Sequence, residues 1–312
     1  MNMATAAGFV SGRSQVVSRL NDYAQLTKAR VTTLIVVTAW CGFFFGARNA
    51  GLPPIGWSLL HALLGIAMVS SGTAALNEVM EYDVDGKMRR TASRPLPAAR
   101  MSLLHGTLVG ALLTIGGSIY LVLFTNWLTG VLALLTSLVY LLVYTPLKRV
   151  SPVCLAVGAI PGAMPGVLGW TAASGRLDWG TLVLFAILFL WQFPHFLAIA
   201  WIYREDYARG AIRMLPVVEP DGRSTSVRVL LYTVALLPVS LVPVLLGMTG
   251  KVYLVGAVLL GFGFLYFAAR LGILRRPVDD ARSRSYARRL FHCSILYLPL
   301  LFTLMMSDAM YR

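Results

Sequence analysis

Residues 55–97 of the chain read IGWSLLHALLGIAMVSSGTAALNEVMEYDVDGKMRRTASRPLP. The first part, residues 55–76, is an apolar run of the length that a helix needs to cross a bilayer, which is about 20 residues. The part that follows begins with four of the chain's 13 acidic residues: Glu78, Glu81, Asp83 and Asp85. This stretch therefore predicts a membrane-spanning helix that ends directly in a charged segment.

Apolar runs of the same kind recur along the whole chain. Its 312 residues are 57% hydrophobic and 13% charged, whereas soluble domains carry roughly 25% charged residues. The composition therefore excludes an ordinary soluble protein. Nine runs are long enough, or nearly long enough, to span the membrane, near residues 31–48, 55–76, 102–123, 127–145, 152–172, 179–202, 228–248, 251–271 and 290–308.

Only helices fit runs of this length in lipid, because an open sheet would leave backbone groups there without hydrogen bonds. The expected fold class is all-α. We expect a polytopic membrane protein of about nine transmembrane helices around a central cavity, with cytoplasmic loops that cap the candidate active site. Residues 25–312 are expected to form a single transmembrane domain, preceded by a weakly structured cytoplasmic tail, residues 1–24.

The basic residues indicate how the chain lies in the membrane. All but four of the 27 Lys and Arg residues fall in the N-terminal tail or in alternate loops; the exceptions are Arg48, Arg176, Lys251 and Arg312. Basic loops stay in the cytoplasm, so we expect a cytoplasmic N-terminus and a periplasmic C-terminus. The tail shows no long Ser- and Arg-rich presequence, which favours a bacterial cell inner membrane over a mitochondrial one.

The net charge of +14 follows mostly from this topology. It does not require a nucleic acid as partner. A basic cytoplasmic face would instead attract anionic membrane lipids and anionic substrates.

The acidic segment has a helical spacing. Asn77, Glu81 and Asp85 are four residues apart, so on a helix they lie on one face, where neighbouring carboxylates repel each other. A cation among them would explain the cluster. It can be Mg²⁺ that carries a phosphate ligand, or the basic run of Lys87, Arg89, Arg90 and Arg94. The alternative is a solvated loop whose charges neutralise each other.

A second acidic patch follows the sixth apolar run. Glu205 and Asp206 lie there between Arg204 and Arg209. Two acidic helix ends that face each other could each hold Mg²⁺ and bind one diphosphate between them. The alternative is a set of exposed local ion pairs, each worth about 0–1 kcal/mol.

Two further motifs contain candidate functional residues. Lys148 and Arg149, in YTPLKR at 144–149, either anchor the helix end at the membrane or neutralise a departing diphosphate, and Arg94 has the same two interpretations. His195, in WQFPHF at 191–196, lies inside an apolar run. Ionisable groups within membrane spans are usually functional, although a histidine can also hydrogen-bond between helices.

Together these motifs resemble a known family. The pattern NxxxExxxD at 77–85, RTxxRPLP at 90–97, YTPLKR, PGAMPG at 161–166, and WQFPHF followed by YREDY at 203–207 is similar to that of the protohaem IX farnesyltransferases (haem O synthases). These enzymes are a branch of the membrane-embedded prenyltransferases typified by 4-hydroxybenzoate polyprenyltransferase. The resemblance extends from Lys28 to Asp308.

The resemblance implies a transferase that moves a farnesyl group from farnesyl diphosphate to a vinyl group of haem B, with addition of water, to give haem O. Mg²⁺ would be the cofactor and haem B a substrate. It implies that residues 25–312 are a prenyltransferase domain. Catalysis and metal binding are assigned to Asn77, Glu81, Asp85 and Asp206, and substrate binding to Arg94, Tyr144, Lys148, Arg149, His195 and Arg204.

Two positions depart from the wider superfamily pattern. The first motif usually has Asp where this chain has Glu81, which keeps the charge. The second is usually DxxxD, but Asp206 is followed four residues later by Gly210. This departure puts a symmetric second metal site in doubt.

The alternatives are another membrane prenyltransferase with an aromatic or chlorophyll-type acceptor and, from another class, a transporter. The concentration of acids at one face argues against a transporter, since a permeation path needs polar groups at mid-membrane. The resemblance leaves open a partnership with haem A synthase or oxidase assembly proteins.

Overall fold

The computed structural model describes residues 17–273 and 278–311, and within these residues the regular structure is helical, with no strand. Nine of the described helical segments are long and apolar enough to span a membrane, as the sequence predicts. In chain order the elements are α2 (Ala29–Asn49), α3 (Trp57–Met80), α4 (Tyr82–Asp85), α5 (Leu103–Phe124), α6 (Trp127–Leu138), η1 (Val139–Tyr144), α7 (Thr145–Leu147), α8 (Cys154–Ser174), α9 (Trp179–Ile202), α10 (Arg204–Arg209), α11 (Leu215–Val218), α12 (Arg223–Leu245), α13 (Lys251–Ile273) and α14 (Ala281–Met310).

Two details differ from the sequence-based expectation, and a third concerns prolines within a helix. Residues 17–26 are helical, so a weakly structured tail is wrong for residues 17–24, while the tail before residue 17 lies outside the described residues. Helix α14 begins at Ala281, nine residues earlier than predicted, because its first turns are basic and only its later turns are apolar. Helix α8 continues without a break through Pro161 and Pro165, since neighbouring helices can compensate for lost backbone bonds.

Side-chain caps fix two of the short connections between long helices. Asn126 precedes α6 and accepts a hydrogen bond from the Thr129 N–H at 3.0 Å. Asp178 forms a capping box with Thr181 at the start of α9. Such caps satisfy backbone N–H groups that the first helical turn leaves without partners.

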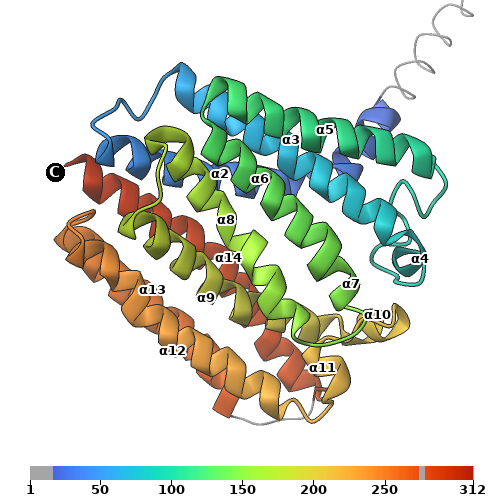
Figure 1. Ribbon diagram of the computed structural model, residues 1–312. Coiled ribbons are helices and arrows are strands. Elements are labelled where there is room, and N and C mark those ends of the chain that lie inside the picture. The colour runs from blue at the N-terminus through green and yellow to red at the C-terminus, as the bar shows by residue number, and fades with distance from the viewer. Residues whose placement is uncertain (1–16, 274–277, 312) are drawn as a thin grey trace, which may run out of the picture.

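The long helices pack in two groups (Figure 1). In the first, α3 packs on α5 and α2 on α8; in the second, α12 and α13 pack with α9 and α14. Contacts of α8 with α9 and of α2 with α14 join the groups. The short helices α4, α7, α10 and α11 gather at one end of the bundle, and the C-terminus lies at the other (Figure 1). Segments that are distant in sequence therefore meet at the first end.

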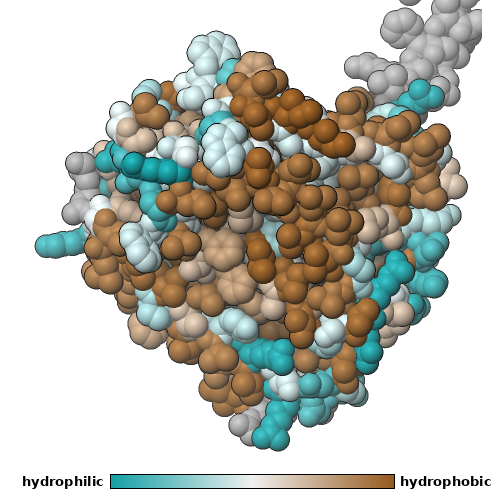
Figure 2. Space-filling view, viewed as in Figure 1, coloured by the Kyte–Doolittle hydropathy of each residue, from teal (hydrophilic) through white to brown (hydrophobic). Residues whose placement is uncertain are grey.

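The lateral surface is apolar. Figure 2 shows hydrophobic side chains over the middle of one face and hydrophilic side chains toward its margins. Leu112 of α5 is 72% exposed and Leu259 of α13 is 68% exposed. Water would disfavour such side chains over so wide an area, whereas lipid accommodates them. The protein is therefore a multi-pass membrane protein.

Glycines bring α2 and α8 into backbone contact. A Cβ added at Gly42 would lie 2.0 Å from the Gly166 carbonyl oxygen, and one added at Gly169 would lie 1.9 Å from that of Ala39. Small residues at such positions let membrane helices approach closely, which is a main source of their packing energy. This contact packs the middle of α2 closely against α8.

Candidate active site

The first acidic motif lies where α3 passes into α4. Helix α3 ends at Met80, and Glu81 (φ −104°, ψ 7°) links the two helices. The backbone nevertheless keeps its helical hydrogen bonds, from Glu81 N–H to Asn77 at 3.0 Å and from Asp85 N–H to Glu81 at 2.8 Å. Asn77, Glu81 and Asp85 are 1%, 5% and 1% exposed. They are therefore not part of a solvated loop.

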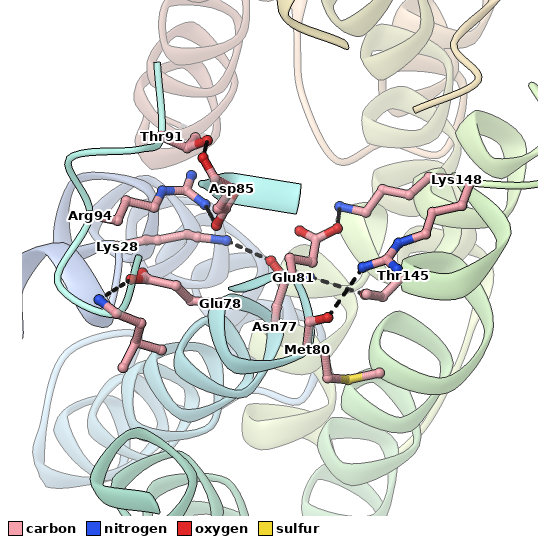
Figure 3. Close-up of polar contacts among 12 residues, drawn as sticks. Lys28, Asn77, Glu78, Met80, Glu81, Asp85, Thr91, Arg94, Thr145 and Lys148 are labelled. Carbon is pink, nitrogen blue, oxygen red and sulfur yellow. Dashed lines mark hydrogen bonds and ion pairs between the residues drawn. The ribbon is translucent and has the colours of Figure 1, made fainter. Parts of the chain in front are cut away.

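Each of these three side chains contacts a cation of the protein itself (Figure 3). Lys148 pairs with Glu81, Arg94 pairs with Asp85 at 2.5 Å, and Lys28 Nζ donates to Asn77 Oδ1 at 2.7 Å. Of the basic run after the motif, only Arg94 reaches these side chains among the contacts of the described residues. The other two cations come from the ends of α7 and α2, so three separate segments meet here. We call these six residues the cation–carboxylate cluster.

Lys28 is a residue of the cluster that sequence reasoning missed. Its backbone is left-handed (φ 48°, ψ 48°), a conformation that costs a non-glycine residue about 1–2 kcal/mol. Burial, reinforced by the charge of Arg94, lowers the pKa of Lys28 to about 8. In the sequence, Lys28 is indistinguishable from the other basic residues that set the orientation.

Thr145 is a second missed residue. Its hydroxyl accepts a hydrogen bond from Asn77 Nδ2 at 3.1 Å and donates to the Tyr140 carbonyl at 2.9 Å. It follows η1, a turn of π-helix. Pro146 lacks an N–H and its ring would clash with the carbonyl four residues earlier in a regular α-helix. The wider π-turn avoids that clash and directs Thr145 and Lys148 toward α3.

The remaining residues of YTPLKR lie at the edge of the cluster. The ring of Tyr144 lies 5.0 Å from Lys148 Nζ. Arg149 donates to the Met80 carbonyl at 3.4 Å, and its side chain is otherwise exposed. Tyr144 and Arg149 therefore lie beside the cation–carboxylate cluster, and their role in substrate binding stays a prediction.

The two acidic loops meet. Asp206 accepts a hydrogen bond from the Arg89 N–H at 3.2 Å and pairs with Arg209. Burial alone would raise the pKa of Asp206, but the hydrogen bonds from Arg209 and Arg89 hold it below its ordinary value. Arg90 of the first loop also lies over the ring of Tyr203, 5.4 Å away. Asp206 is 8% exposed. Its contact with Arg89 places it against the segment that follows Asp85.

Two other predicted residues lie elsewhere. Arg204 lines a small surface pocket with Pro216 and Pro220. Glu205 is exposed and pairs with Arg284 at 2.8 Å, and this hydrogen bond lowers the pKa of Glu205. The second acidic patch is therefore divided, with Asp206 turned inward and Glu205 outward.

His195 lies between α9 and α14. Its Nδ1 is 2.7 Å from the Ser294 hydroxyl. Its ring stacks on Trp191, with ring centres 4.6 Å apart, and lies near Phe291. The Ser294 hydroxyl donates to the Phe291 carbonyl at 2.7 Å, so it accepts from His195 Nδ1–H. On this assignment Nε2 carries the lone pair, and no hydrogen bond to it is found among the described residues.

The donor set of the cluster suits a hard divalent cation. Within residues 17–273 and 278–311, no three His, Cys, Asp or Glu side chains form a metal-binding group. Asn77, Glu81 and Asp85 instead offer one amide and two carboxylates, and each already holds a positive group. Mg²⁺ commonly binds through one or two carboxylates and completes its shell with waters and substrate phosphates. These residues therefore fit Mg²⁺ bound together with a diphosphate.

Comparison with known proteins identifies the class. Residues 35–295 match the UbiA prenyltransferase family, and the chain belongs to this family. Among its curated relatives is the protoheme IX farnesyltransferase of Koribacter versatilis (strain Ellin345), which is 56% identical over 296 residues, 95% of this chain and 96% of the relative. The resemblance inferred from the motifs is confirmed.

Solved structures show the same fold. A digeranylgeranylglyceryl phosphate synthase superimposes with a TM-score of 0.76 at 17% identity and covers 95% of this chain and 100% of its own. A UbiA homologue from Archaeoglobus fulgidus, described as bound to DMAPP and Mg²⁺, superimposes with a TM-score of 0.61 at 13% identity, covering 91% and 99%.

Proposed function

We propose that this protein transfers the farnesyl group of farnesyl diphosphate to a vinyl group of haem B, with addition of water, and so produces haem O and diphosphate. The observation that carries the proposal is the buried cation–carboxylate cluster, which offers both a metal site and cations for a diphosphate. The name of the relative from Koribacter versatilis supports haem as the acceptor.

Four residues would hold Mg²⁺ against the diphosphate: Asn77, Glu81, Asp85 and Asp206. When bound, Mg²⁺ would neutralise the charge that the diphosphate gains on leaving. The DMAPP- and Mg²⁺-bound homologue supports this cofactor. Binding of the metal requires Lys148 and Arg94 to turn from the carboxylates toward the phosphate oxygens. Once turned, these cations would stabilise the negative charge that develops on the leaving diphosphate.

The reaction is a substitution at the first carbon of the farnesyl chain. The carbon–oxygen bond breaks, and its electron pair leaves with the diphosphate, which Arg94, Lys148 and Arg149 stabilise. The vinyl group of haem B then attacks the allylic cation, and water adds to the resulting porphyrin-stabilised cation and loses a proton. Apolar side chains of the spans must exclude water before the attack.

His195 is the proposed contact to the haem acceptor. Its free Nε2 suits an axial bond to the haem iron, and Trp191 and Phe291 hold its ring. The Soret band of bound haem B tests this role. His195→Ala is expected to shift the band and weaken haem binding, and an unchanged spectrum and affinity would remove His195 from the acceptor site.

We also propose that the bundle lies in a bacterial inner membrane with the cation–carboxylate cluster at its cytoplasmic side, as the distribution of basic residues suggests. A phosphate-bearing substrate from the cytoplasm would then meet the end of the bundle where α4, α7 and α10 gather (Figure 1).

Paired variants of the acidic loop test the proposed function. Asp85 is 1% exposed and bound to Arg94, whereas Asp83, two residues earlier, is exposed. We expect Asp85→Asn to lower haem O formation at saturating Mg²⁺ by about tenfold or more, and Asp83→Asn to leave it near the wild-type rate. Equal rates for both variants would remove the metal assignment.

A further inference from the structure

Lys28 lies in a strained backbone turn that contacts of the neighbouring residues hold in place. The helical segment of residues 17–26 ends just before it, and α2 begins just after it. The left-handed turn between them (φ 48°) directs the Lys28 side chain to Asn77. Strained backbone of this kind persists only where the surrounding contacts determine it, and it often marks a functional position.

Contacts of the preceding segment hold this turn. Asp22 accepts a hydrogen bond from Arg100 Nε at 2.8 Å, and the Tyr23 hydroxyl lies 2.7 Å from His105 Nε2. Leu26 is fully buried and packs in a cluster with residues of α3 and of the loop that follows α4. The segment is thus fastened to the loop that contains Arg94, and Lys28 is placed between that loop and α2.

Lys28 reaches an amide rather than a carboxylate. Its one polar contact among the described residues is Asn77 Oδ1, at 2.7 Å. The charges of Arg94, Lys148, Glu81 and Asp85 all act on it. A neutral amide does little to compensate the charge of a partly buried ammonium group, whereas an anion in good hydrogen-bond geometry offsets more of its desolvation. Three cations lie here among the carboxyl groups of Glu81, Asp85 and the buried Glu78. Arg94 and Lys148 each pair with a carboxylate, whereas Lys28 contacts only the amide.

We propose that Lys28 is a further diphosphate-binding cation beside Arg94, Lys148 and Arg149, which donates to Asn77 in the free protein and to a phosphate oxygen of the prenyl diphosphate in the complex. This inference rests on the proposed function and adds a residue to it. When Asn77 turns its oxygen to the metal, Lys28 loses its partner at the moment when the diphosphate supplies another. The ammonium group of Lys28 and the amide oxygen of Asn77 would thus each have a partner both in the free protein and in the complex.

Binding of pyrophosphate with Mg²⁺ to the purified full-length protein, measured by calorimetry, tests the proposal. Lys28→Met removes a charge-assisted hydrogen bond to the phosphate. Because this bond contributes to the free energy of binding, the variant should raise the pyrophosphate Kd by about tenfold or more. Lys28→Arg should recover part of the affinity. Arg30→Met removes an exposed cation two residues along and should leave the Kd unchanged.

Lys28→Gly separates binding from folding. Glycine adopts the left-handed turn freely, so this variant should unfold at a higher temperature than Lys28→Met while binding pyrophosphate as weakly. Wild-type affinity in both variants would overturn the role of Lys28 and leave the proposed function intact. Failure of the wild-type protein itself to bind pyrophosphate with Mg²⁺ would overturn both.

Discussion

Replacement of Lys148 by Met removes the cation from a buried ion pair and leaves Glu81 without it. The side chains of Lys148 and Glu81 are 10% and 6% exposed, so water screens the pair very little. Loss of one partner from a buried pair costs about 3–5 kcal/mol, because the other charge stays buried and uncompensated. We expect Lys148→Met to lower the free energy of unfolding by that amount when Mg²⁺ is absent.

Mg²⁺ should reverse much of this loss. In the wild-type protein the metal must displace Lys148 from Glu81, whereas in Lys148→Met the carboxylate is already free. A ligand at 100 times its Kd stabilises the folded state by about 2.7 kcal/mol. The stabilisation by Mg²⁺ should therefore be larger in the variant than in the wild-type protein, although the variant should bind pyrophosphate more weakly.

The measurement is thermal unfolding of the detergent-solubilised protein in chelator and in saturating Mg²⁺. Lys87→Met, which removes an exposed cation of the same loop, should behave as the wild-type protein in both conditions. The double variant Lys148→Met with Glu81→Gln should recover stability in chelator and lose the response to Mg²⁺. An equal shift by Mg²⁺ in Lys148→Met and in the wild-type protein would refute the assignment of Glu81 as a metal ligand.

Three other variants, two of them with a matched control, probe the packing and the site. Gly169→Ala places a methyl group 1.9 Å from a carbonyl oxygen of α2 and should cost about 1–3 kcal/mol in unfolding experiments, whereas Gly116→Ala, with open space around it, should be neutral or stabilising. Asp206→Asn should lower turnover about tenfold or more, while Glu205→Gln stays near the wild-type rate. Thr145→Val leaves Asn77 Nδ2 without its acceptor and should cost about 1–3 kcal/mol in the same unfolding assay.

Much of the fold follows from the sequence because a bilayer imposes a length on each apolar helix. The predicted runs and the structural helices agree to within several residues, except at the start of α14. The spacing of Asn77, Glu81 and Asp85 likewise predicts a common face, since four-residue steps keep side chains together even where α3 passes into α4.

The rest of the site depends on tertiary contacts that spacing does not reveal. Lys28 reaches Asn77 only because of a left-handed turn fastened to a loop about 80 residues away. Thr145 reaches it only because a π-turn rotates the end of the span. Of the basic run, Arg94 meets a carboxylate of the cation–carboxylate cluster, whereas Arg90 stacks on tyrosines. Charge and spacing alone do not distinguish the two residues, and only the resemblance of the RTxxRPLP motif singles out Arg94.

The most direct test of the account is the mass of the product. Purified protein would be incubated with haem B, farnesyl diphosphate and Mg²⁺, and the extracted haem analysed by liquid chromatography and mass spectrometry. The account predicts a haem heavier by one farnesyl and one hydroxyl group, formed by the wild-type protein and not by Asp85→Asn. Unmodified haem from a folded preparation that binds pyrophosphate would contradict haem as the acceptor and favour another prenyl acceptor at the same site.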